Sequence, residues 1–217
     1  TADYWRCCGY SSSVGTPVNS IGYQVPRTGD GYAGLIAYSQ SSFSDYKEYI
    51  EVKLKAPLIA GYPYVITYYV SLADNVSSYA VKNLGFVLSP MDVGIDYLYG
   101  TIANVPLSEP NDNYLSNTTD WVQMQFFYTA LGGEEYLTIG NFDPTIATDA
   151  QYINPSGSGF AYYFVEDVSV ELDYNSPIFN GNYGNGYDTT AISANAYYLD
   201  GALMDVIIPN VITLNGD

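Results

Sequence analysis

The stretch YKEYIEVKL at residues 46–54 alternates between apolar and polar side chains, and this alternation decides the fold class. Ile50, Val52 and Leu54 are separated by charged residues, so they share one face of an extended chain. Successive side chains of a β-strand point to opposite faces, and this pattern therefore predicts a half-buried strand.

The same period of two recurs on both sides of this stretch. Residues 121–130 and 164–172 alternate in the same way, and residues 62–72 are apolar on both faces, as a central strand requires. Helical periodicity is almost absent, and Gly, Pro, Asn and Asp separate the segments. Further strands are expected near residues 31–38, 79–88, 135–141 and 206–214. The sequence predicts an all-β fold, an antiparallel β-sandwich of the jelly-roll kind with a C-terminal β extension.

The expected core consists of the inward-facing apolar residues of these strands. They are Ile50, Val52, Leu54, Val65, Val122, Met124, Phe126, Leu137, Ile139, Val168 and Val170. We expect the sandwich to occupy residues 1–174, followed by a Gly/Asn/Tyr-rich linker or extension at 175–204 and a C-terminal strand at 205–217.

The composition narrows the classes of function. Six Lys and Arg against 23 Asp and Glu give a net charge of -17, which repels phosphate backbones and argues against a nucleic-acid partner. Charged residues are only 13% of the chain, whereas 25 residues are Tyr, which suits a secreted, extracellular or cell-surface β-protein. No apolar run approaches the ~20 residues that a membrane helix needs.

The two cysteines, Cys7 and Cys8, are neighbours in the sequence. A disulfide between adjacent residues would be strained, so we expect reduced or separately partnered thiols. They do not define a disulfide framework.

An enzyme is the least supported class. The chain contains no histidine, which excludes Ser-His and Cys-His nucleophiles and histidine-ligated zinc. Glu134 and Glu135 are adjacent on a strand and point to opposite faces, so they do not form the paired carboxylates of a glycoside hydrolase. We expect a Gly-Gly turn with solvated glutamates there, and no catalytic residue.

Five stretches taken in order carry a family resemblance: TADYWRCC at 1–8, VPRTGDGYAGL at 25–35, YKEYIEVKLKAPLIAGYPYVITYYVSLAD at 46–74, TDWVQMQFFYTALGGEEYLTIGNF at 119–142 and AYYFVEDVSV at 161–170. As a set they resemble the jelly-roll modules, similar to carbohydrate-binding modules, of gliding-motility-associated surface proteins exported by type IX secretion. IPNVITLNGD at 208–217 looks like the opening of the type B sorting domain that follows in such proteins, with Leu214 at an expected proline.

The resemblance implies one candidate cofactor, a structural Ca²⁺. In related carbohydrate-binding modules this ion lies between the first strand and an acidic pair on the last strand, and Glu166 and Asp167 match that pair. The alternative is that Asp167 is a charge on the outer face of a strand.

Aromatic residues suggest a glycan site, because a sugar's apolar face can stack on Trp or Tyr. Four aromatic residues are expected in loops and are candidates for this role: Tyr4, Trp5, Tyr97 and Tyr99. Trp121 begins a strand and is expected in the core. The Tyr-rich surface is equally typical of adhesive contacts, of a subunit interface, or of β-propensity alone.

The C-terminal residues 205–217, DVIIPNVITLNGD, are unusually apolar and β-branched for the end of an acidic chain. The family's first strand, upstream of TADYW, has no counterpart here, which would leave a sheet edge unpaired. The tail completes its own sandwich, completes that of a neighbouring copy in a head-to-tail filament, or begins a sorting domain. The residues expected to form the assembly strand are Val206, Ile208, Val211, Ile212 and Leu214.

The sequence therefore favours a non-catalytic extracellular surface module for adhesion and assembly, with a filament joined by strand complementation as its assembled form. The alternative is a glycan-binding module like the carbohydrate-binding modules. The expected partners are further copies of the chain or a glycan, with no nucleic acid and no membrane span.

Overall fold

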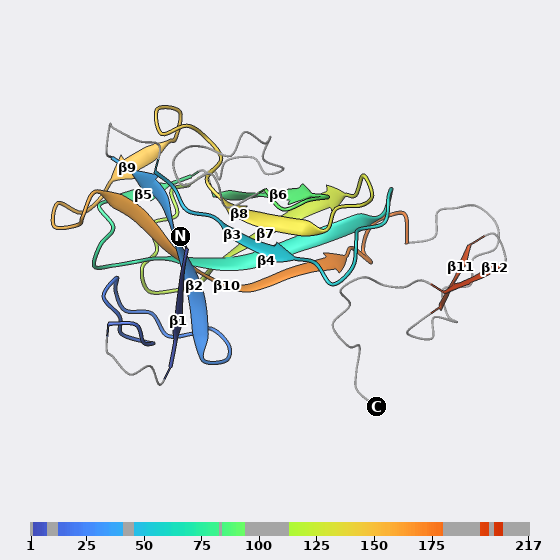
Figure 1. The fold of residues 1–217 in the computed structure, drawn as a ribbon, viewed down its shortest axis with the longest axis horizontal. Coiled ribbons are helices and arrows are strands. Elements are labelled where there is room, and N and C mark those ends of the chain that lie inside the picture. The colour runs from blue at the N-terminus through green and yellow to red at the C-terminus, as the bar shows by residue number, and fades with distance from the viewer. Residues whose placement is uncertain are drawn as a thin grey trace.

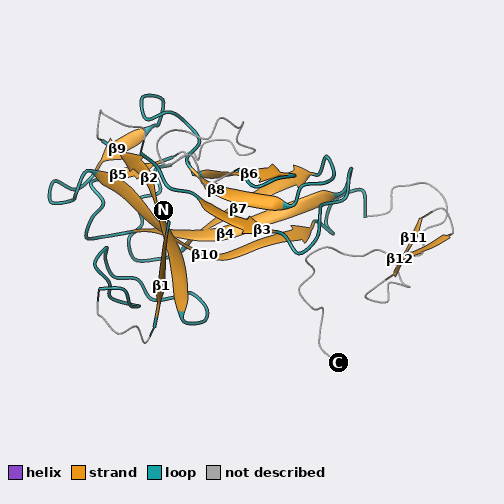
Figure 2. Ribbon diagram, in the orientation of Figure 1, coloured by secondary structure: helices purple, strands orange, loops and turns teal. Residues whose placement is uncertain are grey.

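The structure, a computed structural model, describes residues 2–7, 13–40, 46–82, 84–93 and 113–179, together with the backbone of two later strands. In these residues it contains strands and loops without a helix (Figure 2). The strands are β1 (Asp3–Arg6), β2 (Gly31–Ser39), β3 (Ile50–Lys53), β4 (Pro63–Leu72), β5 (Tyr79–Val81), β6 (Gly85–Ser89), β7 (Val122–Thr129), β8 (Tyr136–Gly140), β9 (Ala150–Tyr152), β10 (Phe160–Leu172), β11 (Ala196–Leu199) and β12 (Ala202–Asp205).

Two antiparallel sheets form the body of the protein (Figure 1). The larger has five strands in the order β1-β2-β10-β4-β7, and the smaller has three in the order β3-β8-β6. Strands β5 and β9 form a short pair, and β11 pairs with β12. The prediction of an all-β antiparallel sandwich is confirmed. Strands β1, β9, β11 and β12 were not expected from the sequence.

The core lies between the two sheets and is rich in tyrosine. Strand β4 turns Tyr64, Ile66, Tyr68 and Val70 into it, all fully buried. The buried hydroxyl groups are hydrogen bonded, as burial of a polar group requires. For example, the Tyr68 hydroxyl donates to the carbonyl of Leu84 at 3.2 Å. Tyrosine thus forms part of the interior. The large number of tyrosines in the sequence did not show that some of them would be buried.

Most of the expected core is confirmed. Met124, Leu137, Ile139 and Val170 are buried. The half-buried residues that pack against the same core are Ile50, Leu54, Val122 and Phe126.

Three expected core residues lie elsewhere. Val65 is on the outer face of β4, because the tyrosines of that strand occupy the inner face. Val52 is 44% exposed on β3, an edge strand of the smaller sheet among the described residues. Val168 is 37% exposed because a bulge interrupts β10.

The bulge reverses which residues of β10 face the core. Glu166 pairs with Tyr69 and Ser169 with Thr67, so β10 advances three residues where β4 advances two. Asp167 takes a φ of 50° at this point, in the left-handed region that aspartate tolerates better than most residues. Strict alternation through 164–172 could not anticipate the inserted residue.

A second hydrophobic cluster lies on the other face of the five-stranded sheet. Its buried members are Trp5, Tyr32, Ala73, Tyr162 and Phe164. Ile21, which precedes β2 in the chain, packs against this cluster. The segment 13–30 therefore covers part of the outer sheet face as an additional layer.

The predicted division of the chain stays a prediction. Phe179 packs against the sandwich core, and its ring lies tilted against Tyr62 at 5.9 Å between ring centroids, so packing continues past the expected end of the sandwich. The β11–β12 hairpin lies inside the expected linker at 175–204. The described residues contain no helix with the length and hydropathy needed to cross a membrane.

Candidate functional site

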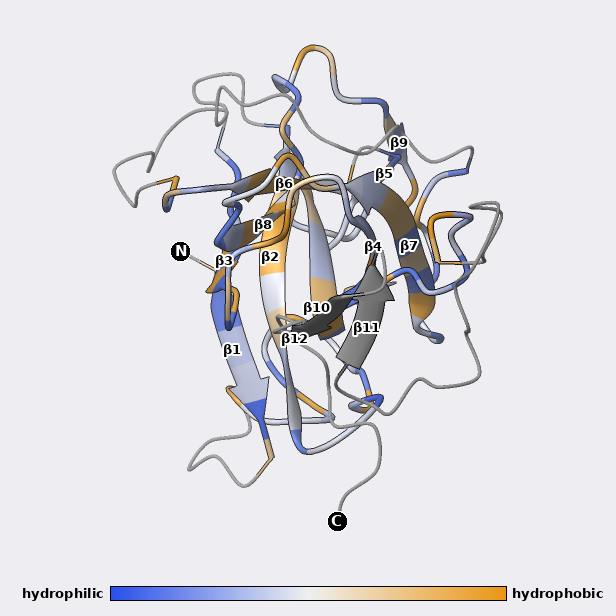
Figure 3. Ribbon diagram, turned by 90° about the vertical axis from the view of Figure 1, so that its right-hand side faces the viewer, coloured by the Kyte–Doolittle hydropathy of each residue, from blue (hydrophilic) through white to orange (hydrophobic). Residues whose placement is uncertain are grey.

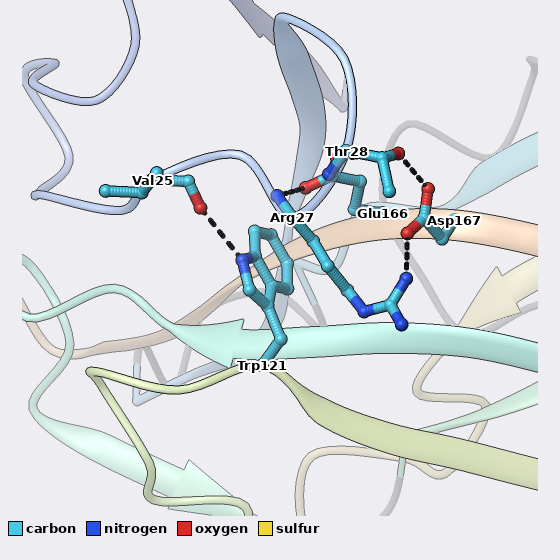
Figure 4. A network of polar contacts seen from close by, with 6 residues as sticks. All are labelled: Val25, Arg27, Thr28, Trp121, Glu166 and Asp167. Carbon is cyan, nitrogen blue, oxygen red and sulfur yellow. Dashed lines mark hydrogen bonds and ion pairs between the residues drawn. The ribbon is translucent and has the colours of Figure 1, made fainter.

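The acidic pair of the β10 bulge is joined to segment 13–30 (Figure 4). Glu166 accepts hydrogen bonds from the backbone N–H groups of Arg27 and Thr28, both at 2.7 Å. Asp167 accepts a hydrogen bond from the Thr28 hydroxyl at 2.5 Å and forms an ion pair with Arg27. These contacts fasten the segment to the strand.

Two aromatic side chains support this arrangement. The Arg27 guanidinium lies 3.6 Å from the ring centroid of Tyr69, a cation–π contact on the outer face of β4. The indole N–H of Trp121 donates to the carbonyl of Val25 at 2.9 Å (Figure 4). Trp121 also packs half-buried against the second cluster, where it meets Tyr32 edge-on.

We call the contacts of Arg27 and Thr28 with Glu166 and Asp167 the Arg27 clamp. The residues at the bulge fit this clamp better than a calcium site. Calcium takes six to eight oxygen ligands. Here the oxygens of Glu166 face two N–H donors, and a guanidinium already neutralises Asp167. Within the described ranges, no three acidic or cysteine side chains gather as a metal site would require. Calcium binding by the pair stays a prediction.

Glu134 has a structural role, and the expectation that it is solvated is wrong. Its side chain is 4% exposed. Its carboxylate accepts hydrogen bonds from the Tyr128 hydroxyl at 2.6 Å and from the N–H groups of Leu131 and Gly132 at 2.7 and 2.8 Å. The turn permits this because Gly132 has a φ of 97°, which glycine adopts without strain.

The electrostatics of Glu134 argue against acid catalysis. Burial alone would raise its pKa, but the hydrogen bonds from Tyr128, from its own backbone N–H and from those of Leu131 and Gly132 outweigh burial and lower the pKa. A general acid needs the opposite shift, toward neutral pH. The neighbouring Glu135 pairs instead with Lys53 at 3.2 Å.

Glu48, a third buried glutamate beside Glu134 and Glu166, is also held by donors. Glu48 accepts hydrogen bonds from the Ile36 N–H at 3.0 Å and from the Tyr46 hydroxyl at 2.9 Å. The buried glutamates of the described residues are thus hydrogen bonded to donors of the fold.

Of the four expected sugar-binding aromatics, the two described ones, Tyr4 and Trp5, do not share one platform. Tyr4 and Trp5 lie in strand β1, so the expectation that they are in loops is wrong. As neighbours in a strand they point to opposite faces: Tyr4 is 69% exposed, whereas Trp5 is 5% exposed. The Trp5 indole N–H donates to the Tyr162 hydroxyl at 3.2 Å. Tyr97 and Tyr99 lie outside the described residues.

The assembly strand expected from the sequence also lies outside the described residues. This applies to Val206, Ile208, Val211, Ile212 and Leu214. Insertion of the tail, its intramolecular return and the sorting-domain reading therefore stay predictions, as does export by type IX secretion.

Sequence reasoning missed a part of the outer sheet face over which none of the described residues lies. Beyond the Arg27 clamp, strands β10, β4 and β7 place Ser169, Thr67 and Gln125 side by side in one row. The next row consists of Glu171, Val65 and Phe127, and Phe127 is 69% exposed. The alternation of β7 between hydrophilic and hydrophobic residues (Figure 3) was visible in the sequence. The sequence did not show that no described residue lies over the outer face of β7.

No known family model matches the chain, and no curated protein matches it. Among solved structures, it is similar to the K1 cleaved adhesin domain of Lys-gingipain from Porphyromonas gingivalis W83, with 14% identity and a TM-score of 0.37 over 79% of this chain and 83% of that one. The K2 cleaved adhesin domain of Lys-gingipain has 11% identity and a TM-score of 0.36 over 67% and 74% of the two chains. A family 16 carbohydrate-binding module has 11% identity and a TM-score of 0.31 over 66% and 78%. Likenesses at this level carry no argument about function.

Proposed function

We propose that this chain is a non-catalytic extracellular surface module that acts in adhesion and assembly. The observation that carries the proposal is the face of the five-stranded sheet that β10, β4 and β7 form and that no described residue covers, which we name the open face. It consists of Val65, Thr67, Gln125, Phe127 and Ser169.

The open face has the chemistry of a contact surface. It combines an exposed aromatic ring with uncharged amide and hydroxyl groups, in a chain whose net charge is -17. Exposed aromatic side chains are enriched at interfaces, and charged residues are depleted at interface cores. Glu171 of β10 lies opposite Val65 at one margin of this face, so its uncharged part is formed by Ser169, Thr67, Gln125 and Phe127.

The acidic groups support the non-catalytic part of the proposal. Glu48, Glu134 and Glu166 are buried and hydrogen bonded to donors of the fold. Glycoside hydrolysis requires two carboxylates that face each other across a substrate. The buried glutamates are committed to holding loops and strands.

A binding assay with matched variants tests the proposal. The chain is immobilised on beads and presented to extracellular-matrix proteins, polysaccharides and bacterial cells. The double variant Val65→Lys/Thr67→Lys places two charges on the open face, and Gln151→Lys places one on the exposed strand β9 as a control. We expect adhesion to be lost in the first and kept in the second. Equal adhesion of all three proteins would refute a role of the open face in adhesion.

A second candidate, glycan binding, is favoured by the row Ser169, Thr67 and Gln125. Three neighbouring strands align hydroxyl and amide groups there, one row from an exposed phenyl ring, and sugars are bound by this combination. A glycan array with the matched pair Gln125→Ala and Gln151→Ala tests this. Loss of a sharp glycan signal in the first variant alone supports it, and the absence of any glycan signal refutes it.

Assembly through the C-terminal residues is a separate part of the proposal. Its support is the β-branched sequence of 206–214, which suits addition to a sheet edge. Removal of residues 206–217 should convert filaments into soluble monomers. Filaments that persist after the deletion would refute strand complementation.

A further inference from the structure

Strand β7 is an edge strand of the five-stranded sheet. In the described part of the chain, its eight residues pair with β4 alone. An unpaired edge presents a row of backbone N–H and C=O groups that another strand can bind.

The hydrogen-bond phase shows which groups of β7 point away from β4. The Ala130 N–H donates to the Tyr62 carbonyl at 2.9 Å, so the backbone of residue 130 faces β4. Hydrogen-bonding direction alternates along a strand, so the outward groups belong to residues of odd number. Pro63 supports this assignment. It lies opposite Thr129, and its carbonyl accepts a hydrogen bond from the Asp173 N–H on the β10 side, so residue 63 directs its backbone away from β7. The outward groups are those of Gln123, Gln125, Phe127 and Thr129, whose side chains are all exposed.

The usual protections of an edge are missing from β7. Its sequence, VQMQFFYT, contains no charge, proline or glycine, and its pairing with β4 runs without a register shift. The other edge strands of the two larger sheets are short: β1 (DYWR) and β3 (IEVK) carry charges, and β6 has five residues. Charged side chains and short length are the common means of blocking edge-to-edge pairing. Strand β7 is therefore the edge best suited to accept a partner.

We propose that β7 pairs antiparallel with β7 of a second copy of this chain about a two-fold axis at Phe126. In this register Gln125 lies opposite Phe127 of the copy, and Gln123 lies opposite Thr129. All four outward residues then exchange hydrogen bonds, and the two five-stranded sheets become one continuous sheet. The two Phe127 rings become diagonal neighbours, within reach of aromatic side chains.

A second copy suits this edge because β7 itself carries no charge. Each chain carries a net charge of -17, so two copies repel wherever carboxylates would meet. The register above places no charged residue opposite another, because 122–129 contains none. Pairing β7 with itself also makes the interface isologous, which closes at a dimer. This site shares Gln125 and Phe127 with the open face, but it adds the backbone edge of β7 and does not use Val65, Thr67 or Ser169. It contains none of the C-terminal residues.

Sedimentation equilibrium of the full chain, from about 1 μM to about 1 mM, tests the dimer. The double variant Gln125→Lys/Phe127→Lys places lysine opposite lysine across the two-fold axis. Val65→Lys/Thr67→Lys is the matched control: these residues lie directly opposite Phe127 and Gln125 on β4, on the same face but one strand from the edge. Thermal melts of both variants check that they fold.

We expect the unmodified chain and the β4 variant to dimerise, and the β7 variant to have a dissociation constant raised about tenfold or more, since like charges directly opposite are destabilising. Hydrogen exchange gives an independent readout: the amides of Gln123, Gln125, Phe127 and Thr129 should exchange more slowly as protein concentration rises. A monomer at every concentration, equal dimerisation of both variants, or unchanged exchange at these amides would overturn the inference. Loss of adhesion with an intact dimer, as expected for the β4 variant, separates this site from the open face.

Discussion

Replacement of Glu166 should loosen the attachment of segment 13–30 to the sheet. Its carboxylate is 7% exposed and accepts the N–H groups of Arg27 and Thr28, each at 2.7 Å. Glu166→Ala leaves both donors without this acceptor. Glu166→Gln keeps one acceptor oxygen but turns an NH₂ group toward the second donor.

The cost follows from the number of bonds lost. A hydrogen bond to a charged group contributes about 1.5–3 kcal/mol, so Glu166→Ala should lower the free energy of unfolding by about 3 kcal/mol and Glu166→Gln by about 1–2 kcal/mol. For a chain of this size, 1 kcal/mol shifts Tm by about 2–4 °C, which gives a decrease of about 6–12 °C for the alanine variant.

Asp167→Asn provides the matched control. Asparagine also tolerates the left-handed backbone at this position, and the lost ion pair with Arg27 is partly exposed, so the cost should stay below about 1 kcal/mol. Urea unfolding and calorimetry measure all three variants, each with calcium and with a chelator. Equal stability of Glu166→Ala and the unmodified chain would refute the clamp. A calcium-dependent Tm that is lost in Glu166→Gln would instead show that the acidic pair binds the ion.

Three further predictions concern stability. Glu134→Gln should cost about 1–2 kcal/mol at pH 7. The folded pKa of Glu134 lies below its ordinary value of 4.5, so this contribution is present above that pH and is lost as pH falls through the folded pKa. The unfolding curves of the two proteins should therefore converge in acid. Tyr162→Phe removes the hydroxyl that accepts from the Trp5 indole, and should cost about 1–2 kcal/mol and change the tryptophan fluorescence. Leu137→Ala should lower the free energy of unfolding by about 2–5 kcal/mol, whereas Val168→Ala should lower it by less than about 0.5 kcal/mol. Similar decreases for the two variants in urea unfolding would contradict the outward position that the bulge gives Val168.

Local alternation was sufficient to predict most of the sandwich. The strands around Ile50, Met124 and Leu137 were placed correctly because one face of each meets a core, and the side-chain period of two reports this directly. The sequence did not show which residues of β4 face the core, because both faces of this strand are apolar. Only the sheet that packs against it decides that Tyr64, and not Val65, lies inside.

The candidate site was harder to predict because it depends on contacts between distant segments. The bond from the Arg27 N–H to Glu166 joins residues 139 positions apart. The sequence identified Glu166 and Asp167 as an acidic pair, but it could not show that an arginine neutralises them. The burial of Trp5 has the same origin, since its partner Tyr162 belongs to the last strand of the larger sheet.

Binding without turnover is the measurement that tests the proposed function most directly. The full chain and its Val65→Lys/Thr67→Lys variant are incubated with each polysaccharide and matrix protein that the beads retain. Bound material is quantified, and the ligand is recovered and analysed for cleavage. The account predicts that the unmodified chain retains the ligand chemically unchanged and that the variant retains at least about tenfold less, equivalent to 1.4 kcal/mol of binding free energy. Cleaved ligand, or equal retention by the two proteins, would contradict it.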